Sequence, residues 1–408
     1  MLALIQPLSP PASCVHATSF IQPDYDLETL LPPETQQSPF GVVRPRRVTR
    51  PVQVGNVQVG GNAPISVQSM LTQDTRDTET CIQEIKRLTE AGCEIIRLAV
   101  PDKQAAEALK TITAASPIPV VADIHFNYQL ALQAAENGVA AIRINPGNIG
   151  RKDFIRQVVK ACQERQLPIR VGVNSGSVEE EIKQKHPHDR VRQLVESALL
   201  NVRLLEEEGF YDTVISVKAS DPLEAVAAYR AVAQVCAYPL HLGVTEAGTL
   251  KRGLIKTSVA FGMLLAEGIG DTIRVSLTAD SIEEVFAGHE MLRSVGRRTE
   301  GANLISCPSC GRCEVDLHKL ANDVEALIAK METPLNVAVM GCFVNGPGEA
   351  NHADIGIAGA KGKYYIFKKD EVIATVPEHE ALAVFAEELK KVEQEKLAQT
   401  HTLNTHAI

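Results

Sequence analysis

Three cysteines stand three residues apart late in the sequence, and a fourth follows at a distance. Cys307, Cys310 and Cys313 lie in ISCPSCGRCEVDL, and Cys342 lies in GCFVNGPGE. Cysteines at such spacings are typical of metal sites. Zinc usually takes two ligand pairs, and the second pair is missing here, so the spacing favours an iron–sulfur cluster over zinc. A redox-active C-x-x-C is less favoured because no thioredoxin-like strand and helix surround it.

The spacing leaves two ligand sets open. Four thiolates from Cys307, Cys310, Cys313 and Cys342 would make a closed cluster of the kind that only transfers electrons. Glu349 offers the other set, because it follows Cys342 across the turn sequence NGPG, which could fold its carboxylate back toward the metal. A carboxylate oxygen exchanges on iron more readily than a thiolate, so this set would leave one iron open to substrate.

Upstream of the cysteines, eight short β-branched runs alternate with amphipathic helical stretches. The runs cover residues 64–70, 94–100, 119–125, 140–146, 169–175, 214–220, 240–246 and 272–277. Alternating strands and helices predict an α/β fold with a parallel sheet, and eight units over roughly 240 residues match a closed (β/α)8 TIM barrel. The runner-up is an open doubly wound sheet, which needs a glycine-rich first turn that follows none of these runs.

Every predicted strand carries polar or charged residues at its end, where a purely structural sequence is free to place valine or leucine. Active sites of barrels lie at these ends. The residues are Gln68, Ser69, Arg97, Asp123, His125, Arg143, Asn145, Asn174, Lys218, Glu246, Arg274 and Ser276. One alone is more often a satisfied loop residue, but all eight ends agree. The four Arg and Lys side chains predict an anionic ligand such as a diphosphate, and the two carboxylates are candidate acids or bases.

The flanking segments complete the predicted organisation. Residues 1–45 are rich in proline and lack periodicity, which predicts a flexible arm before a barrel over 46–300. A smaller α+β iron–sulfur domain is expected over 301–398, with helices at 315–331 and 378–398 and strands at 335–341, 353–359, 363–369 and 371–376. A disordered tail is expected at 399–408.

The composition is that of an ordinary globular protein. Of 408 residues, 45% are hydrophobic and 22% charged, and the formal charge of −9 argues against nucleic-acid binding. No run of 18 apolar residues is present, which argues against a membrane span. The arm contains Asp24, Asp26, Glu28 and Glu34, unlike a transit peptide, so a cytoplasmic location is expected. The five scattered cysteines are expected to be buried, as in a reducing compartment.

Eight segments, in order between about residue 48 and about residue 360, resemble the signature segments of the 4-hydroxy-3-methylbut-2-enyl diphosphate synthase family. They are ADIHFNY, RINPGNIG, GVNSGS, SVKASD, HLGVTEAG, EGIGDTIRVSL, ISCPSC and GCFVNGPGEA. The resemblance implies a TIM barrel joined to a domain with one 4Fe–4S cluster, in a homodimer where one subunit's cluster domain closes over the other's barrel. It also implies the two-electron ring opening and dehydration of 2-C-methyl-D-erythritol 2,4-cyclodiphosphate, with ferredoxin or flavodoxin as donor.

The matching positions imply a role for each candidate. Glu246 would donate a proton to the departing hydroxyl, and Glu349 would be displaced from the cluster by substrate. Cys313 occupies a position that the family does not use as a ligand. The diphosphate would be held by Arg97, His125, Arg143, Arg170, Lys218, Arg274 and Ser276, with Asn174 and Asp123 assisting, and the cluster by Cys307, Cys310, Cys342 and Glu349.

Two alternatives belong to other classes of protein. One is a non-catalytic iron–sulfur redox sensor with a metabolite-binding barrel, which predicts four thiolate ligands and no consumption of the cyclodiphosphate. The density of functional groups at the strand ends argues against it. The other is a zinc-stabilised barrel hydrolase, which would need no electron donor.

Overall fold

The computed structural model describes residues 44–329, 331–343, 350, 352–369 and 371–405. The chain divides into two units, Met1–Arg298 and Thr299–Ile408, close to the boundary predicted between residues 300 and 301. Each unit is built around its own hydrophobic core. The segment 1–43, which includes most of the predicted arm, and Glu349 lie outside the described residues.

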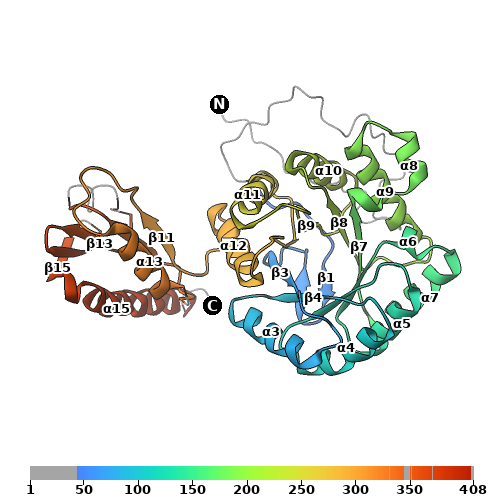
Figure 1. Ribbon diagram of the computed structural model, residues 1–408, viewed down its shortest axis with the longest axis horizontal. Helices are drawn as coiled ribbons and strands as arrows, with labels where there is room; N and C mark the ends of the chain where they lie inside the picture. The colour runs from blue at the N-terminus through green and yellow to red at the C-terminus, as the bar shows by residue number, and fades with distance from the viewer. Residues whose placement is uncertain (1–43, 330, 344–349, 351, 370, 406–408) are drawn as a thin grey trace. The chain divides into compact units, whose positions relative to one another are not determined.

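The first unit is an eight-stranded parallel barrel (Figure 1). Its strands are β3 (Ser66–Met70), β4 (Ile95–Ala99), β5 (Val120–Asp123), β6 (Ala141–Ile144), β7 (Ile169–Asn174), β8 (Thr213–Lys218), β9 (His241–Leu242) and β10 (Thr272–Ile273). They pair in the order β8-β7-β6-β5-β4-β3-β10-β9. A parallel bridge between Ile215 and Leu240 joins the two outer strands and closes the ring. The TIM barrel prediction is therefore confirmed, and the open doubly wound sheet is excluded.

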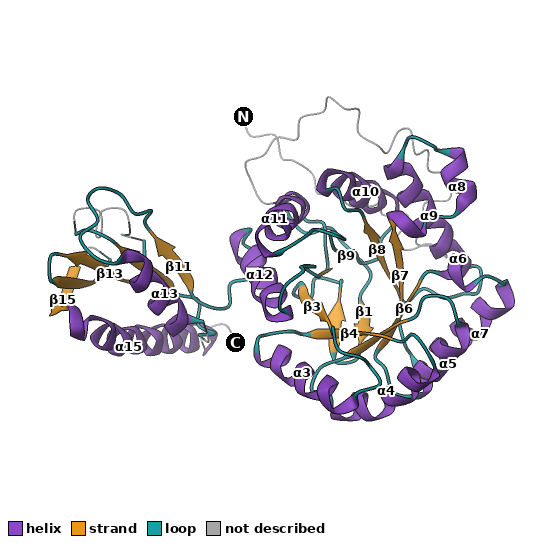
Figure 2. Ribbon diagram, in the orientation of Figure 1, coloured by secondary structure: helices purple, strands orange, loops and turns teal. Residues whose placement is uncertain are grey.

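Helices surround the barrel strands, as Figure 2 shows in purple and orange. They are α3 (Thr78–Glu90), α4 (Lys103–Ala115), α5 (Tyr128–Glu136), α6 (Pro146–Ile149), α7 (Lys152–Arg165), α8 (Glu180–Lys185), α9 (Arg190–Glu206), α10 (Pro222–Val235), α11 (Leu250–Ala266) and α12 (Ser281–Ser294), with a 3-10 turn at Ser175–Ser177. Asp77, Asp102 and Asp221 accept hydrogen bonds from backbone N–H groups at the starts of α3, α4 and α10. These caps satisfy backbone N–H donors that a helix start leaves free. They therefore fix the point at which each of these loops enters its helix.

The floor of the barrel is closed by a hairpin that the sequence did not predict. Strands β1 (Val52–Val54) and β2 (Val57–Val59) are antiparallel, and their valines pack against Ile95, Val121 and Val214 at the starts of barrel strands. The preceding segment is tied down by Arg47, whose buried guanidinium donates to the carbonyls of Ala233, Cys236 and Tyr238. Arg47, which lies just beyond the predicted arm of residues 1–45, is thus a structural residue.

The chain leaves the barrel at this same end. Arg298 donates to the Ile65 carbonyl, just before β3, and to the carboxylate of Glu94, just before β4. The Glu94 carboxylate in turn accepts from the backbone N–H of Val67. The last residue of the first unit is therefore fixed at the N-terminal ends of the strands.

The second unit holds a five-stranded mixed sheet of order β11-β12-β13-β14-β15. Its elements are β11 (Asn303–Ser306), α13 (Leu317–Ile328), β12 (Asn336–Met340), β13 (Ile355–Ala360), β14 (Lys363–Lys368), β15 (Glu371–Pro377) and α15 (Glu378–Thr405). Strands β11, β12 and β13 are parallel, and β14 and β15 are antiparallel to their neighbours. Residues of α13 and α15 share one apolar cluster with the sheet, so the predicted α+β domain is confirmed.

The last helix is longer than expected. Helix α15 continues to Thr405, into the segment 399–408 that was predicted to be a disordered tail. No glycine or proline stands between Glu378 and Thr405 to end the helix. The residues of this segment have sufficient helix propensity for the helix to continue. Among the helices of the described ranges, none has the length and apolar character needed to cross a membrane.

Candidate active site

Inward-facing side chains change character along the barrel strands. Because side chains alternate between the two faces of a strand, Val121 and Asp123 point to the same side of β5, as do Val214 and Lys218 on β8. The lower members of each pair contact the apolar floor, and the upper members line a cavity. The apolar and polar layers of the barrel interior therefore come from the same strands, two or four residues apart.

One cavity gathers the predicted substrate-binding residues at the C-terminal ends of the strands. It measures roughly 540 Å³, part of it open solvent, which suits a small-molecule ligand. All nine residues predicted to bind substrate lie around it, together with Gly172, Ser216 and Thr245, which the sequence reasoning did not single out. The nine are Arg97, Asp123, His125, Arg143, Arg170, Asn174, Lys218, Arg274 and Ser276.

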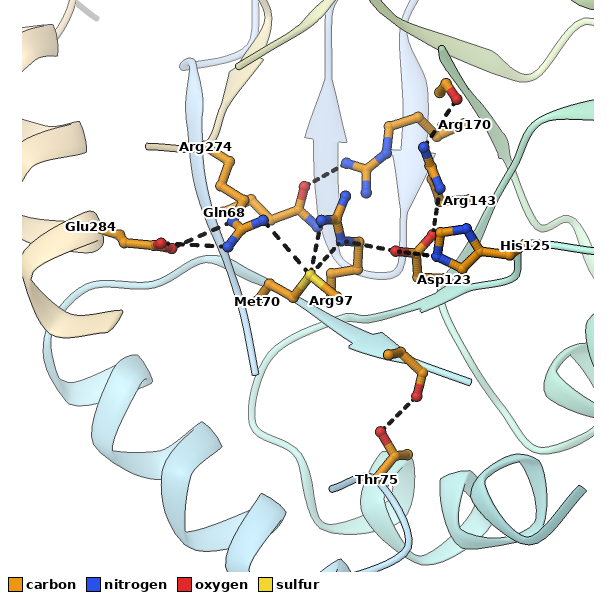
Figure 3. A network of polar contacts seen from close by, with 12 residues as sticks. Gln68, Met70, Thr75, Arg97, Asp123, His125, Arg143, Arg170, Arg274 and Glu284 are labelled. Atoms are coloured by element: carbon orange, nitrogen blue, oxygen red, sulfur yellow. Dashed lines mark hydrogen bonds and ion pairs between the residues drawn. The ribbon is translucent and has the colours of Figure 1, made fainter. Parts of the chain in front are cut away.

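Asp123 lies among three cationic or titratable side chains (Figure 3). Its carboxylate accepts from Arg143 Nη1 at 3.0 Å and lies 3.6 Å from Arg97 Nε and 3.8 Å from His125 Nε2. Burial alone would raise the pKa of this carboxyl, but the charges of Arg97, Arg143, His125 and Arg170 outweigh it and lower the pKa to about 2. Asp123 is therefore ionised at neutral pH and serves as a counter-charge, so it cannot be a proton donor there.

Arg274 is held from the opposite side by Glu284, a residue of α12. The guanidinium lies 3.4 Å from both carboxylate oxygens, and the same carboxylate accepts from Ser69 Oγ and from the Leu277 backbone N–H. Glu284 is buried. Ser69, which was a strand-end candidate, therefore supports the cavity from behind and does not line it.

Arg170 extends deeper into the barrel than the other cations. Its Nη1 donates to Gln68 Oε1, the other strand-end candidate of β3. Arg170 Nη2 and Gln68 Nε2 are buried and have no hydrogen-bond partner among the described residues. Buried donors of this kind usually meet ordered water or a ligand. The lower part of the cavity therefore has unused hydrogen-bonding capacity.

The crowding of cations changes their proton affinities. Burial, followed by the charges of Arg97, Arg274, Arg170 and Arg143, lowers the pKa of Lys218 well below its usual value. Burial also lowers the pKa of Arg97 to about 10. An anion in the cavity would reverse these shifts, because it favours the charged forms. An anion in the cavity would therefore stabilise the charged forms of Lys218 and Arg97.

Gly172 of β7 and Gly243, directly after β9, make room for the cations. A Cβ on Gly172 would lie 2.3 Å from Arg143 Nε, and one on Gly243 would lie 2.7 Å from Lys218 Cε. The Gly172 carbonyl also accepts from Arg143 Nη2 at 3.0 Å. Glycine inside a strand often marks such a close approach, so these positions were recognisable in VGVN and LGVT.

Glu246 lies at the mouth of the barrel, beyond the two-residue strand β9. The predicted strand 240–246 ends early because the chain leaves its ladder with β10 after Leu242. Glu246 is exposed, follows the cavity residue Thr245, and has a left-handed backbone with φ of 54°. Its Oε2 accepts from Ser220 Oγ at 2.6 Å. A non-glycine residue in this conformation costs energy, and such strain is concentrated at functional sites.

Asn145 was a strand-end candidate that the structure assigns to the loop. Its side chain caps α6 by accepting from Gly147 N–H, and it donates to the Ser177 carbonyl. Buried Asn201 donates to Glu179, and its Oδ1 accepts from the same Gly147 N–H. Asn145 therefore fixes the loops after β6 and β7 and does not line the cavity.

The cysteines of the second unit collect at one edge of its sheet. Cys307 follows β11 and Cys342 follows β12, and these strands are parallel neighbours with Ser306 opposite Val339. The Gly341 N–H donates to Cys307 Sγ at 3.3 Å. Hydrogen bonds from the backbone and side chain of Arg312 lower the pKa of exposed Cys310. The lowered pKa favours the thiolate of Cys310, the form that binds metal.

The thiols of these cysteines are donors of the type that iron–sulfur clusters use. Within the described ranges, which leave out Glu349, no three side chains of the usual metal-binding types are gathered closely enough to hold an ion. Cys313 donates from Sγ to the Val315 carbonyl at 3.2 Å, and a Cβ on Gly341 would lie 2.7 Å from that sulfur. Cys313 thus packs beside the predicted ligand loop, and its exclusion from the ligand set stays a prediction.

Some residues of the cavity left a signal in the sequence and others did not. Glu284 falls on the buried face of its helix with Ser281, Val285 and Gly288, a position where a carboxylate calls for a partner. Thr245 adjoins a predicted strand end. Met70, whose sulfur lies between Arg97 and Arg274, gave none, because methionine at a strand end is an ordinary apolar residue.

The fold and the cavity define a two-domain barrel protein, with a cavity lined by cationic side chains at the strand ends and a second domain that presents thiols at a sheet edge. Residues 49–289 match the family model described as the GcpE TIM-barrel domain, and residues 303–391 match that of the GcpE protein C-terminal domain. The chain belongs to this family, and the resemblance seen in the sequence is confirmed.

Relatives in this family are similar over most of the chain. A protein of Lawsonia intracellularis is 53% identical over 348 residues, which are 85% of this chain and 97% of the relative. One of Clostridium perfringens is 54% identical over 347 residues, 85% of this chain and 98% of the relative. Both are named 4-hydroxy-3-methylbut-2-en-1-yl diphosphate synthase (flavodoxin). A dihydropteroate synthase structure from Xanthomonas albilineans, at 14% identity and a TM-score of 0.43 over 60% of this chain and 97% of that one, is too distant to bear on function.

Proposed function

We propose that this protein catalyses the reductive ring opening and dehydration of 2-C-methyl-D-erythritol 2,4-cyclodiphosphate to 4-hydroxy-3-methylbut-2-enyl diphosphate. The observation that carries the proposal is one cavity onto which Arg97, Arg143, Arg170, Lys218 and Arg274 converge. A cyclic diphosphate is small and poly-anionic, so it matches both the size and the charge of this cavity. The names of the relatives support the same product.

Within this proposal the barrel residues bind and orient the substrate. The arginine forks and Lys218 hold the diphosphate oxygens, and His125, Asn174 and Ser276 supply further hydrogen-bonding groups around the cavity. Asp123 keeps Arg97 and Arg143 in place as their counter-charge. Glu246, held by Ser220 at the mouth, donates the proton that turns the departing hydroxyl into water.

The cofactor of the proposal is one 4Fe–4S cluster held by Cys307, Cys310, Cys342 and Glu349. When bound, such a cluster supplies electrons one at a time and a Lewis-acidic iron. The hydrogen bonds from Arg312 stabilise the thiolate of Cys310, and the Gly341 N–H donates to Cys307 Sγ. The reaction opens a ring carbon–oxygen bond and removes one oxygen as water, so it consumes two electrons and two protons. Flavodoxin is the proposed donor because the relatives carry it in their names, and ferredoxin is the other candidate.

A homodimer and a cytoplasmic location are also part of the proposal. The family resemblance implies the homodimer, in which one subunit's cluster domain closes over the other's barrel. Sedimentation of the full-length protein tests this, with a mass of one chain as the contradicting result.

Anaerobic turnover tests the central proposal. The protein purified without oxygen should be brown, contain about four irons, and convert the cyclodiphosphate when reduced flavodoxin is supplied. A Cys307→Ser variant serves as the control, because it should lose both iron and turnover. A colourless zinc-loaded protein that is active would refute the proposal, and an iron-loaded protein that never consumes the cyclodiphosphate would instead support a redox sensor.

A further inference from the structure

Met70 lies between two guanidinium groups of the cationic network. Its Sδ accepts from Arg97 Nη2 at 2.9 Å and Arg97 Nε at 3.2 Å, and Arg274 Nη1 lies 3.7 Å away on the other side. Figure 3 shows the sulfur between the two guanidinium groups. Met70 is half-buried at the end of β3, so solvent does not fully replace these contacts.

The barrel register explains why one side chain reaches both arginines. Met70 stands directly opposite Arg97 in the pairing of β3 with β4. Strand β10, which ends just before Arg274, is the other neighbour of β3. A side chain that points inward from the end of β3 therefore lies between the two cations. The pairs Ser66–Thr272 and Val67–Ile273 put Arg274 level with Gln68, and its Nη1 lies 3.7 Å from the Met70 sulfur.

The sulfur matters most for Arg97. Among the described residues, Met70 Sδ is the one hydrogen-bond acceptor of the Arg97 guanidinium, because the Asp123 carboxylate lies 3.6 Å away and forms an ion pair without a hydrogen bond. Arg97 is only 8% exposed. A buried guanidinium without an acceptor would pay the desolvation of its N–H groups, so the thioether fixes its orientation.

We propose that Met70 is a positioning residue that aligns Arg97 and Arg274 for a diphosphate by offering them a neutral acceptor. The inference rests on the proposed function, since it takes the cavity to bind a diphosphate. A thioether is a weak acceptor, so it orients the N–H groups without competing strongly with phosphate oxygens. It is also uncharged, so it leaves the excess positive charge of the cavity intact.

Substitutions at residue 70 separate these two properties. Met70→Leu keeps the size and removes the acceptor, and Met70→Glu supplies a strong acceptor that carries a negative charge. Met70→Gln supplies a neutral carbonyl oxygen and is the conservative rescue. If alignment by a neutral acceptor is the role of Met70, affinity for inorganic pyrophosphate should fall in the order Met, Gln, Leu, Glu.

The experiment titrates the full-length protein, purified anaerobically with its cofactor, with inorganic pyrophosphate and then measures turnover. Met70→Leu should weaken pyrophosphate binding and raise KM about ten-fold, the loss expected for one hydrogen bond to a charged group, while kcat changes little. Met70→Glu should weaken binding about a hundred-fold or more yet raise the melting temperature, because it forms ion pairs with both arginines. Gain of stability with loss of binding is not what misfolding produces.

Met263→Leu is the matched control, because Met263 is a half-buried methionine of α11 that packs against the barrel core. It should leave pyrophosphate binding and KM unchanged. The inference is overturned if Met70→Leu binds pyrophosphate as the unaltered protein does, or if Met70→Glu binds no worse than Met70→Leu. Failure of the unaltered protein itself to bind pyrophosphate and to turn over would refute the proposed function, and this inference with it.

Discussion

Asp123 lies within 4 Å of Arg97, His125 and Arg143, and its carboxyl has a pKa lowered from 3.8 to about 2. A carboxylate would repel the anionic ligand proposed for this cavity, so its presence needs a reason. The reason is that Arg97 and Arg143 are buried and would otherwise repel each other without compensation. Asp123 therefore weakens the binding of an anion but fixes the positions of the Arg97 and Arg143 guanidinium groups.

The linkage of Asp123 to stability gives the first prediction. A folded-state pKa below the unfolded value stabilises the protein above pH 3.8, and this contribution disappears as the pH falls toward 2. Asp123→Asn should therefore lower the free energy of unfolding by about 2 kcal/mol at pH 6, and the deficit should shrink below pH 4. Urea unfolding of the ligand-free protein across this range measures it. A deficit that stays constant or grows with acid would contradict the pairing.

Glu246 is the subject of the second prediction. Glu246→Gln keeps the size of the side chain and can keep the bond from Ser220, but it removes the transferable proton. Turnover should fall about 100-fold or more, as for loss of a general acid, whereas the dissociation constant of the cyclodiphosphate should change little. Ser220→Ala, which removes only the hydrogen bond, is the milder comparison. Equal losses in binding and turnover would argue that Glu246 holds substrate and does not donate a proton.

At the scale of elements, β7 shows how a strand positions charge by omitting a side chain. Gly172 lets the Arg143 guanidinium lie flat against the strand, where it meets the Gly172 carbonyl. Arg170 and Asn174 flank Gly172 on the same face of β7. One strand therefore contributes a cation deep in the cavity, space for the Arg143 side chain, and an amide near the mouth.

The third prediction tests this gap. Gly172→Ala should displace Arg143, weaken pyrophosphate binding about ten-fold and cost about 1–3 kcal/mol of stability, since the new methyl group overlaps a buried side chain. Gly176→Ala is the control, because a Cβ at Gly176 meets nothing within 4 Å. Calorimetric titration and thermal unfolding of both variants make the comparison. Similar behaviour of the two variants would show that the Arg143 contact does not matter.

The elements also show what the sequence could and could not predict. All eight barrel strands were placed from β-branched runs, because parallel strands buried on both faces are continuously apolar apart from their ends. The hairpin of β1 and β2 was missed although VQVGNVQV alternates valine with glutamine around a Gly-Asn turn, which is a hairpin signal. The end of α15 was missed because helix termini without glycine or proline carry little signal.

The predicted site depended on two kinds of information. Residues such as Arg97 and Lys218 were visible because a charge at a strand end of a barrel has few structural uses. Arg170 lies near the start of its strand, and only the family resemblance nominated it; the structure shows that it reaches the cavity from below. Met70 and Glu284 act through arginines, and their importance depends on three-dimensional contacts that spacing does not encode.

On the scale of the whole molecule, the two units have separate hydrophobic cores, which gives the fourth prediction. A chain cut after Arg298 should yield a folded barrel that binds pyrophosphate with the affinity of the full-length protein but holds no iron and shows no turnover. Circular dichroism, titration and iron analysis of residues 1–298 test this. A fragment that fails to fold, or that folds without binding pyrophosphate, would show that the barrel depends on the second unit.

The hairpin that closes the barrel floor also determines how ligand and water enter and leave the cavity. In the described residues the valines of β1 and β2 close the floor of the barrel, so ligand and water exchange through the opposite end. Arg170 and Gln68 line the space next to this floor, and each has a buried N–H group with no hydrogen-bond partner among the described residues. Water that hydrates those donors must leave before the ligand enters or remain for its entire residence. A ligand bound at the mouth therefore controls how fast the water beneath it exchanges.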